Sequence, residues 1–156
     1  MIHILEHLAV GNVVDAESAP YGALLNVAAE VELDPAVVQD RPYLKVPILD
    51  MKPVPPFQLQ EAVAFLDRHV PDKRVLVVCD GGVGRGPSVV VGYLCAKGMR
   101  FGQAVEFVAV RKPYMSILPD LIESVRKAFA RPITFFRLDS FSLPSKAADP
   151  APAGSP

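Results

Sequence analysis

The chain has 156 residues, of which 51% are hydrophobic and 21% are charged. This length suits one domain, and this composition excludes a disordered chain, a collagen-like fibre and a coiled coil. Sixteen basic side chains against seventeen acidic ones leave a formal charge of −1, so no overall basic field attracts nucleic acid or anionic lipid, and any anionic ligand must be held by a local site.

Short apolar runs predict the strands. The runs at 2–5 and 8–10 indicate two short strands, and the compact run at 23–28 is typical of a buried strand. Residues 43–49 alternate less cleanly, and Pro47 favours an edge position or a strand end. The unbroken, charge-free run at 75–78 is expected to form a central strand covered on both faces.

Helical spacing separates these runs. Apolar residues recur every three or four positions between 59 and 70, where Pro71 ends the predicted helix. Pro87 suits the first turn of a helix expected over 88–97, which Gly98 ends. Two more helices are expected over 103–111 and 119–130. The alternation of strand and helix predicts an α/β fold.

The composition changes near the C-terminus. Residues 144–156 include four Pro and four Ala and are expected to be a disordered tail. Residues 132–143 contain three Phe and are expected to pack back on the domain. The alternative is an exposed hydrophobic segment that binds a partner. We therefore predict one domain over 1–131, a packed extension over 132–143 and a tail.

The most informative stretch lies between the strand at 75–78 and the next helix. Its glycines let successive N–H groups turn inward around one point, and the helix N-terminus adds unpaired donors and partial positive charge. These features predict a phosphate-binding loop that has a sulfur at its base and reads Cys79, Asp80, Gly81, Gly82, Val83, Gly84 and Arg85.

Cys79 and Arg85 are the candidate catalytic side chains of this loop. A free cysteine has a pKa of ~8.5, whereas helix N-termini and nearby cations lower the pKa to ~3.5–7.5 and produce a nucleophilic thiolate. The planar fork of Arg85 matches two oxygens of a phosphoryl group. The alternative for Cys79 is a plain buried core cysteine, a position that needs neither a glycine loop nor an arginine.

With this loop the sequence resembles the cysteine-dependent protein phosphatases, specifically their compact dual-specificity branch. The resemblance runs from about Ile4 to Phe129 and includes the segments 8–12, 24–27 and 44–50 and the helix that ends in Arg111 and Lys112. It implies a compact dual-specificity-phosphatase-like fold, with a central mixed, mostly parallel sheet of about five strands flanked by helices. The run from Gly84 to Pro87 is most similar to the phosphatases of regenerating liver, which are prenylated; the last residues here contain no cysteine, so no lipid anchor is expected at that end.

The resemblance also implies the roles of three residues. Cys79 attacks phosphorus and forms a phosphocysteine, while Arg85 and the loop amides hold the phosphoryl oxygens. Asp50 matches the general acid of the family, which protonates the leaving oxygen and then activates water. The alternative for Asp50 is a turn residue before the proline-rich segment 52–56.

Three positions depart from the family pattern. Val78 replaces the usual His before the nucleophile, and Gly86 replaces the Ser or Thr whose hydroxyl steadies the departing thiolate, so we expect slow breakdown of the intermediate. Asp80 places an acid in a loop without lysine, which disfavours highly phosphorylated inositols and favours phosphoproteins or aryl phosphates. Ser88 and Arg111 are candidates for the second step or the pocket rim; the alternatives are a hydroxyl pointing elsewhere and a solvated helix end.

The leading hypothesis is thus a cysteine-dependent phosphomonoester hydrolase that needs no cofactor or metal. A catalytically slow phosphate-binding module and a rhodanese-type sulfurtransferase remain as alternatives. His3 and His7 stand four residues apart, but the local pattern is strand-like and shows no third ligand for a metal. Two cysteines, no signal-like N-terminus and no apolar run of ~18 residues predict a cytoplasmic protein without a membrane span.

Overall fold

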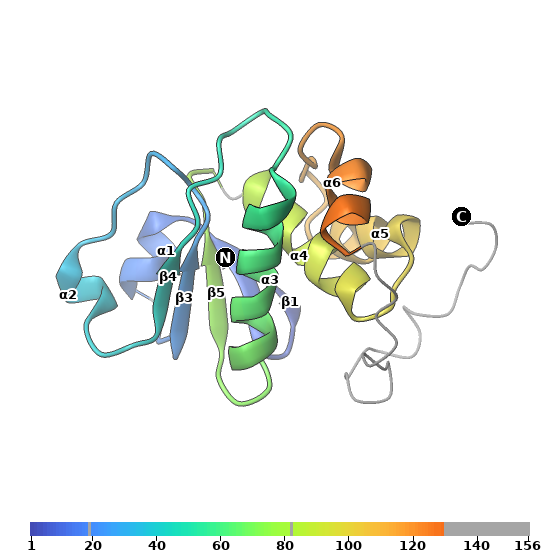
Figure 1. The fold of residues 1–156 in the computed structure, drawn as a ribbon. Helices are drawn as coiled ribbons and strands as arrows, with labels where there is room; N and C mark the ends of the chain where they lie inside the picture. The colour runs from blue at the N-terminus through green and yellow to red at the C-terminus, as the bar shows by residue number, and fades with distance from the viewer. Residues whose placement is uncertain (19, 82, 130–156) are drawn as a thin grey trace.

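The computed structural model describes residues 1–18, 20–81 and 83–129, so the expectations for 132–156 lie outside the described residues. A single five-stranded sheet has the order β1-β2-β5-β3-β4 (Figure 1). Its β1 edge pairs antiparallel with β2, and the other three pairings are parallel, which confirms the mixed, mostly parallel sheet. The strands are Ile2–Leu5 (β1), Leu8–Gly11 (β2), Ala23–Asn26 (β3), Tyr43–Lys45 (β4) and Val75–Val78 (β5).

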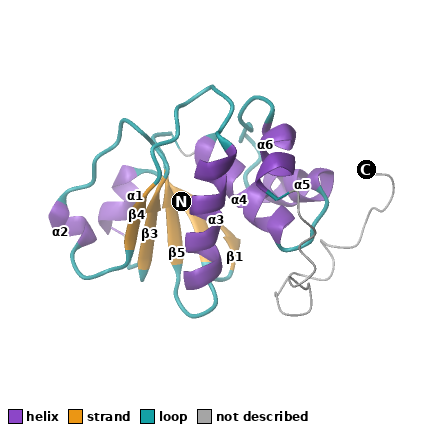
Figure 2. Ribbon diagram, viewed as in Figure 1, coloured by secondary structure: helices purple, strands orange, loops and turns teal. Residues whose placement is uncertain are grey.

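Six helices are described, and they cover both faces of the sheet. Figures 1 and 2 show α3 in front of the sheet and α1 behind it, with α4, α5 and α6 grouped beside α3. The last three helices pack on α3 or on one another, so that they form one layer. The helices are Val13–Ser18 (α1), Pro35–Val38 (α2), Pro56–His69 (α3), Arg85–Ala96 (α4), Phe101–Arg111 (α5) and Leu121–Ala128 (α6).

The central strand β5 positions the loop that follows it. All four of its residues are fully buried, as are the facing residues of β2 and β3. Because β2, β3 and β5 run parallel, their carboxyl ends meet at one edge of the sheet, where ligands bind in open α/β sheets. The predicted phosphate-binding loop leaves β5 at this edge.

Several element boundaries differ from the sequence predictions for local reasons. The strand expected over 43–49 ends at Lys45, two residues before Pro47, which has no N–H for a sheet hydrogen bond. The helix expected from residue 88 already begins at Arg85. The short helix α1 was not predicted; there Asn12 and Asp15 each accept the other's backbone N–H through a side-chain oxygen, at 3.0 and 2.9 Å, and form a capping box.

Within the described ranges, none of the helices is both long and apolar enough to span a membrane.

Candidate active site

Cys79 lies at the junction of β5 and the loop, with its residue only 1% exposed. Its N–H donates to Gly11 O on β2 at 3.1 Å, which fixes the backbone at this point. The Gly86 N–H, one of the donors in the first turn of α4, points at the Cys79 Sγ at 3.4 Å. A helix N-terminus therefore faces the sulfur, an arrangement that favours its anionic form.

The sulfur opens into a cavity of about 250 Å³ at the edge of the sheet. This volume lies below the ~300–1,000 Å³ of pockets for drug-sized ligands, so it suits the phosphorylated end of one side chain. Asp80 is exposed and does not line the cavity, and Gly82 lies outside the described residues. The residues around it are Asp50, Met51, Cys79, Gly81, Val83, Gly84, Arg85 and Ser116.

Arg85 is held in place although its side chain is only 3% exposed. Its Nη1 donates to Glu30 Oε1 at 2.8 Å and to Ile48 O at 3.0 Å, and its Nη2 donates to Glu30 Oε2 at 2.5 Å. A guanidinium has five N–H donors. The donors that are not hydrogen-bonded to any described residue are therefore the Nε–H and one Nη2–H, which lie on the same edge and form a fork for two oxygens.

Glu30 is one residue of this site that the sequence analysis missed. Hydrogen bonding to Arg85 lowers the Glu30 pKa to about 2, and the same hydrogen bond raises the pKa of Arg85. Its position in the sequence could have indicated it. Glu30 follows the end of β3 by four residues, and β3 ends at the same edge of the sheet as β5, where the loop begins. Asn26 orders this connection by accepting the Ala28 N–H at 3.0 Å and donating to Val31 O at 2.9 Å.

Asp50 stands at the mouth of the cavity with its side chain 58% exposed. Its Oδ1 accepts the Met51 N–H at 2.9 Å and lies 3.8 Å from Arg85 Nε. Met51 has a φ of 59° and is 79% exposed, so a large apolar residue occupies the left-handed region beside this carboxylate. The geometry thus brings the predicted acid, nucleophile and arginine to one cavity.

The two candidates for the rim or the second step lie away from the lining. Ser88 is fully buried, and its hydroxyl accepts the Leu118 N–H at 2.9 Å, which ties the segment before α6 to α4. The Arg111 guanidinium lies 3.7 Å from the centre of the Phe107 ring and donates to Phe107 O at 3.0 Å. Instead, Ser116 lines the cavity and donates its N–H to Val83 O at 2.9 Å.

The remaining candidates are engaged elsewhere. His3 Nε2 lies 3.1 Å from the Tyr21 hydroxyl, and His7 Nδ1 lies 3.2 Å from Val70 O. No group of three or more His, Cys, Asp or Glu within the described chain is arranged to hold a metal ion. Burial raises the pKa of Cys95 to about 12, so this thiol stays protonated at neutral pH.

Comparison with known proteins supports the same fold. No family model matches the chain. A stretch of 72 residues, which is 45% of this chain, is 39% identical to part of the protein-tyrosine-phosphatase IBR5 of Arabidopsis thaliana. The match covers only 28% of the length of IBR5. Among solved structures, Tk-PTP in its active form aligns with a TM-score of 0.71 at 20% identity, over 83% of this chain and 96% of that one.

Two further dual-specificity phosphatases align equally well. Human DUSP28 has a TM-score of 0.71 at 19% identity, over 82% of this chain and 94% of its own. DUSP15 has a TM-score of 0.71 at 20% identity, over 83% and 88% of the two chains. The chain therefore has the fold of the dual-specificity phosphatases, and part of its sequence is similar to a protein-tyrosine phosphatase, as the sequence resemblance implies.

Proposed function

We propose that the protein is a phosphomonoester hydrolase, a protein phosphatase of the dual-specificity or tyrosine type, that acts through a cysteinyl-phosphate intermediate. The observation that carries the proposal is the convergence at one cavity of the Cys79 sulfur, the two unbonded donors of Arg85 and the carboxylate of Asp50. The catalytic unit is residues 1–131.

In the first step the Cys79 thiolate attacks phosphorus, and the bond between phosphorus and the ester oxygen breaks. The Nε and Nη2 edge of Arg85 and the loop amides bind the phosphoryl oxygens as charge shifts between them. Asp50 gives its proton to the leaving oxygen, so that the substrate departs as a neutral alcohol or phenol. A carboxyl group that stands exposed at the mouth is suitably placed for this transfer.

In the second step water attacks the phosphocysteine, Asp50 takes its proton, and the sulfur leaves as a thiolate. Gly86, the residue after Arg85, has no hydroxyl to donate to that sulfur. The Gly86 N–H, at 3.4 Å, is a backbone donor to the Cys79 Sγ and not a hydroxyl. We therefore expect hydrolysis of the intermediate to be slower than its formation.

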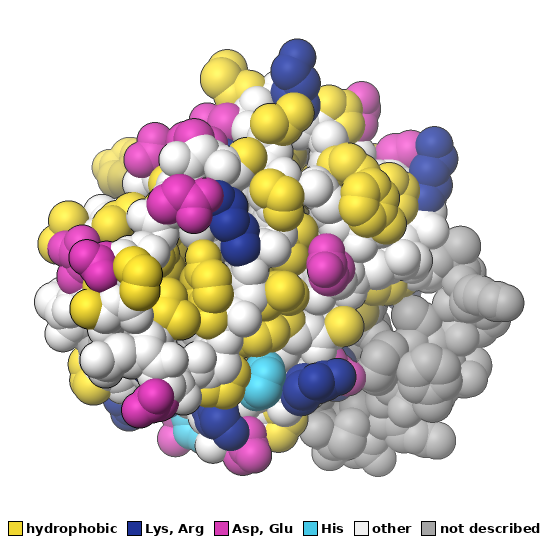
Figure 3. Space-filling model, turned by 60° about the vertical axis from the view of Figure 1, so that its left-hand side comes forward, with side chains coloured by type: hydrophobic (Ala, Val, Ile, Leu, Met, Phe, Trp, Pro, Cys, Tyr) yellow, Lys and Arg dark blue, Asp and Glu magenta, His cyan; other side chains and the backbone are white. Residues whose placement is uncertain are grey.

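The proposed substrates are phosphorylated proteins and aryl phosphates. Arg85 is the cation that lines the catalytic cavity among the described residues, and no second cation lies there for an additional phosphate. Figure 3 shows basic and acidic side chains interspersed with hydrophobic ones on the face it draws, with no basic patch of the kind that binds nucleic acid. We place the reaction in the cytoplasm, where the nucleophilic thiol stays reduced.

The test is hydrolysis of p-nitrophenyl phosphate under reducing conditions by the purified protein. We expect steady turnover that Cys79→Ser abolishes and that Asp50→Asn reduces by ~10²–10⁴-fold. Rapid mixing should reveal an initial burst of nitrophenol, because we expect the phosphocysteine to form faster than it is hydrolysed. Hydrolysis that survives Cys79→Ser would overturn the covalent mechanism, and binding of phosphate without turnover would leave a phosphate-recognition module.

A further inference from the structure

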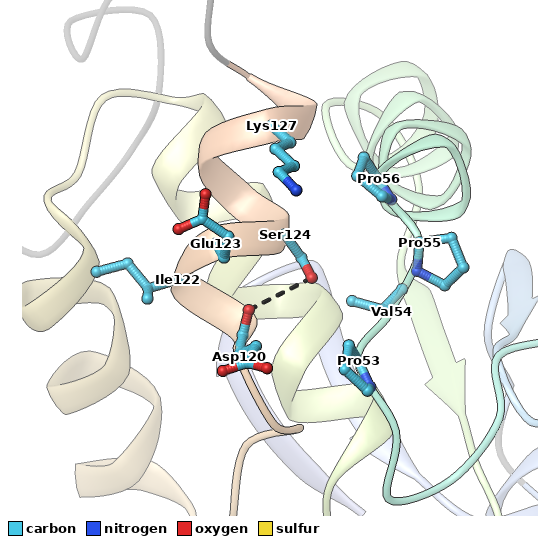
Figure 4. Close-up of a pocket in the computed structure, with 9 residues that line it drawn as sticks. All are labelled: Pro53, Val54, Pro55, Pro56, Asp120, Ile122, Glu123, Ser124 and Lys127. Atoms are coloured by element: carbon cyan, nitrogen blue, oxygen red, sulfur yellow. Dashed lines mark hydrogen bonds between the residues drawn. The ribbon is translucent and has the colours of Figure 1, made fainter.

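A second cavity, of about 480 Å³, lies between the segment that precedes α3 and one side of α6 (Figure 4). Pro53, Pro55 and Pro56 form one wall, and Ser124 and Lys127 stand on the other. We call this cavity the proline groove. Its volume falls within the range of ~300–1,000 Å³ that is typical of ligand pockets.

The proline wall is rigid. Each proline ring fixes its own φ, and Pro55 has the extended angles φ −60° and ψ 138°. Val54 lies between these prolines and is 1% exposed, which anchors the wall to the hydrophobic core. A surface that is already ordered loses little conformational freedom when a ligand packs on it.

The opposite wall presents an uncompensated cation. Figure 4 shows the Lys127 ammonium and the Ser124 hydroxyl facing the prolines, whereas the Glu123 carboxylate points away from them. Glu123 forms an ion pair with Arg126 at 3.5 Å. Lys127 has no ion pair with any described residue. Asp120 also lines the groove, and none of the ion pairs between described residues joins its carboxylate to Lys127.

The proline groove adjoins the catalytic cavity through the chain itself. Met51 lines the catalytic cavity, and Pro53 lines the groove two residues later. Their Cα atoms are therefore at most ~7 Å apart, because each residue spans at most ~3.6 Å. A substrate chain extended at ~3.3 Å per residue covers this step from one rim to the other in about two residues, and the opposite wall of the groove lies farther along.

The charges of the two cavities indicate what the groove accepts. Of the cations that line them, Arg85 is committed to Glu30 and to the phosphate, which leaves Lys127. Asp80, which is exposed on the loop after β5, repels an acidic residue directly beside the phosphorylated one. An acidic side chain of the substrate can therefore pair with Lys127 only if it lies farther along the chain from the phosphorylated residue.

Resting on the proposed function, we propose that the proline groove binds an acidic side chain two to four residues from the phosphorylated residue of a protein substrate. Lys127 pairs with its carboxylate, and the prolines pack against its methylene groups. Because Lys127 is exposed, the expected effect is modest: about a two- to fivefold lower KM, weakening as salt is added.

The test uses alanine-rich phosphotyrosine peptides that carry Glu, Gln or Lys three residues before or after the phosphotyrosine. The peptides form two series, one with the variable residue before the phosphotyrosine and one with it after. In one of these series we expect the Glu peptide to have a lower KM than the Gln and Lys peptides. Lys127→Gln should bring the Glu-to-Gln ratio of kcat/KM to about one, and Lys127→Glu should shift the preference to Lys. The matched control is Arg68→Gln, which removes an exposed cation of α3 that lines neither cavity and should retain the Glu preference and the hydrolysis of p-nitrophenyl phosphate.

Equal loss of the Glu preference in Lys127→Gln and Arg68→Gln would overturn the proposal, because it would reduce the effect to general surface charge. Absence of the preference in the wild-type protein would also overturn it. Binding of the same peptides to the Cys79→Ser protein, followed by fluorescence anisotropy, tests the groove without turnover. Failure to hydrolyse p-nitrophenyl phosphate would count against the proposed function and leave the peptide-binding result to decide on the groove.

Discussion

Arg85 presents its two unbonded donors to the cavity already oriented, because Glu30 and Ile48 O fix one side of the guanidinium. An unrestrained arginine would lose side-chain freedom when phosphate binds, whereas this one has been ordered by folding. Glu30 acts through Arg85 and does not line the cavity, so we regard it as a positioning residue.

Glu30→Gln should lower kcat/KM for p-nitrophenyl phosphate by about tenfold, since hydrogen bonds to charged groups contribute ~1.5–3 kcal/mol and Gln retains part of one. KM and the inhibition constant of inorganic phosphate should rise together, which a purely structural role would not produce. Glu32→Gln is the matched control, because Glu32 pairs with Lys45 and is 81% exposed. Unchanged phosphate inhibition in Glu30→Gln would contradict the positioning role.

The same pair predicts a pH dependence of stability. The folded-state pKa of Glu30 is about 2, below its ordinary value of 4.5, so the unfolded chain takes up this proton first. Its contribution to the free energy of unfolding is complete above about pH 4.5 and is lost as pH falls towards 2. Urea titrations between pH 6 and 3 should show a smaller acid loss in Glu30→Gln than in the wild type; parallel curves would contradict this linkage.

Met51 allows a test of backbone strain. A non-glycine residue in the left-handed region costs ~1–2 kcal/mol, and the side chain of Met51 is too exposed to lose much packing. Met51→Gly should therefore raise the free energy of unfolding by about 0.5–1 kcal/mol after the added entropy of the unfolded glycine. Met51→Ala keeps the strain and should bring no gain in the urea midpoint.

At the scale of elements, the contact between β2 and α4 explains why position 86 carries no side chain. A Cβ on Gly86 would stand 2.8 Å from Val10 Cγ1 and 3.4 Å from Cys79 Sγ. The first distance is a steric clash, and Val10 is fully buried and cannot easily move aside. A Ser or Thr hydroxyl at this position is thus excluded by a strand residue 76 positions earlier.

Gly86→Ser alone should destabilise the protein by ~1–3 kcal/mol through overpacking and should not speed the second step. In the background of Val10→Ala, which removes the clashing methyl group, Gly86→Ser should be accommodated and should shrink the burst of nitrophenol. Val10→Ala with Gly86→Ala is the control, because it fills the same space without a hydroxyl. An equal burst in the two double variants would contradict a role for the hydroxyl.

The strands and long helices were predictable because each carries its own signal. The apolar run of β5 and the helical spacing of α3 are local patterns that tertiary contacts reinforce. The helices α1 and α2 have six and four residues, too few for a periodic signal, and their capping residues define them. Single side-chain hydrogen bonds stabilise short helices of this kind, and the hydrophobic pattern of the sequence does not predict such bonds.

At the scale of the molecule, the residues around the candidate cavity could be predicted where the chain is continuous and were missed where the fold joins distant segments. Cys79 and Arg85 belong to one loop, and Asp50 was found through the resemblance. Glu30 lies 55 residues before Arg85, and the parallel pairing of β3 with β5 brings their following loops together. Ser116 reaches the cavity through a loop that precedes α6, and nothing in its local sequence marks it.

The two thiols of the chain offer very different targets to an electrophile. Cys95 is held protonated by a pKa of about 12, whereas Cys79 receives an amide donor and opens into the cavity. A small alkylating reagent such as iodoacetamide should therefore modify one cysteine per molecule at neutral pH, and inorganic phosphate should protect it. Mass spectrometry of the alkylated peptides would then count competent molecules in any preparation, without a substrate.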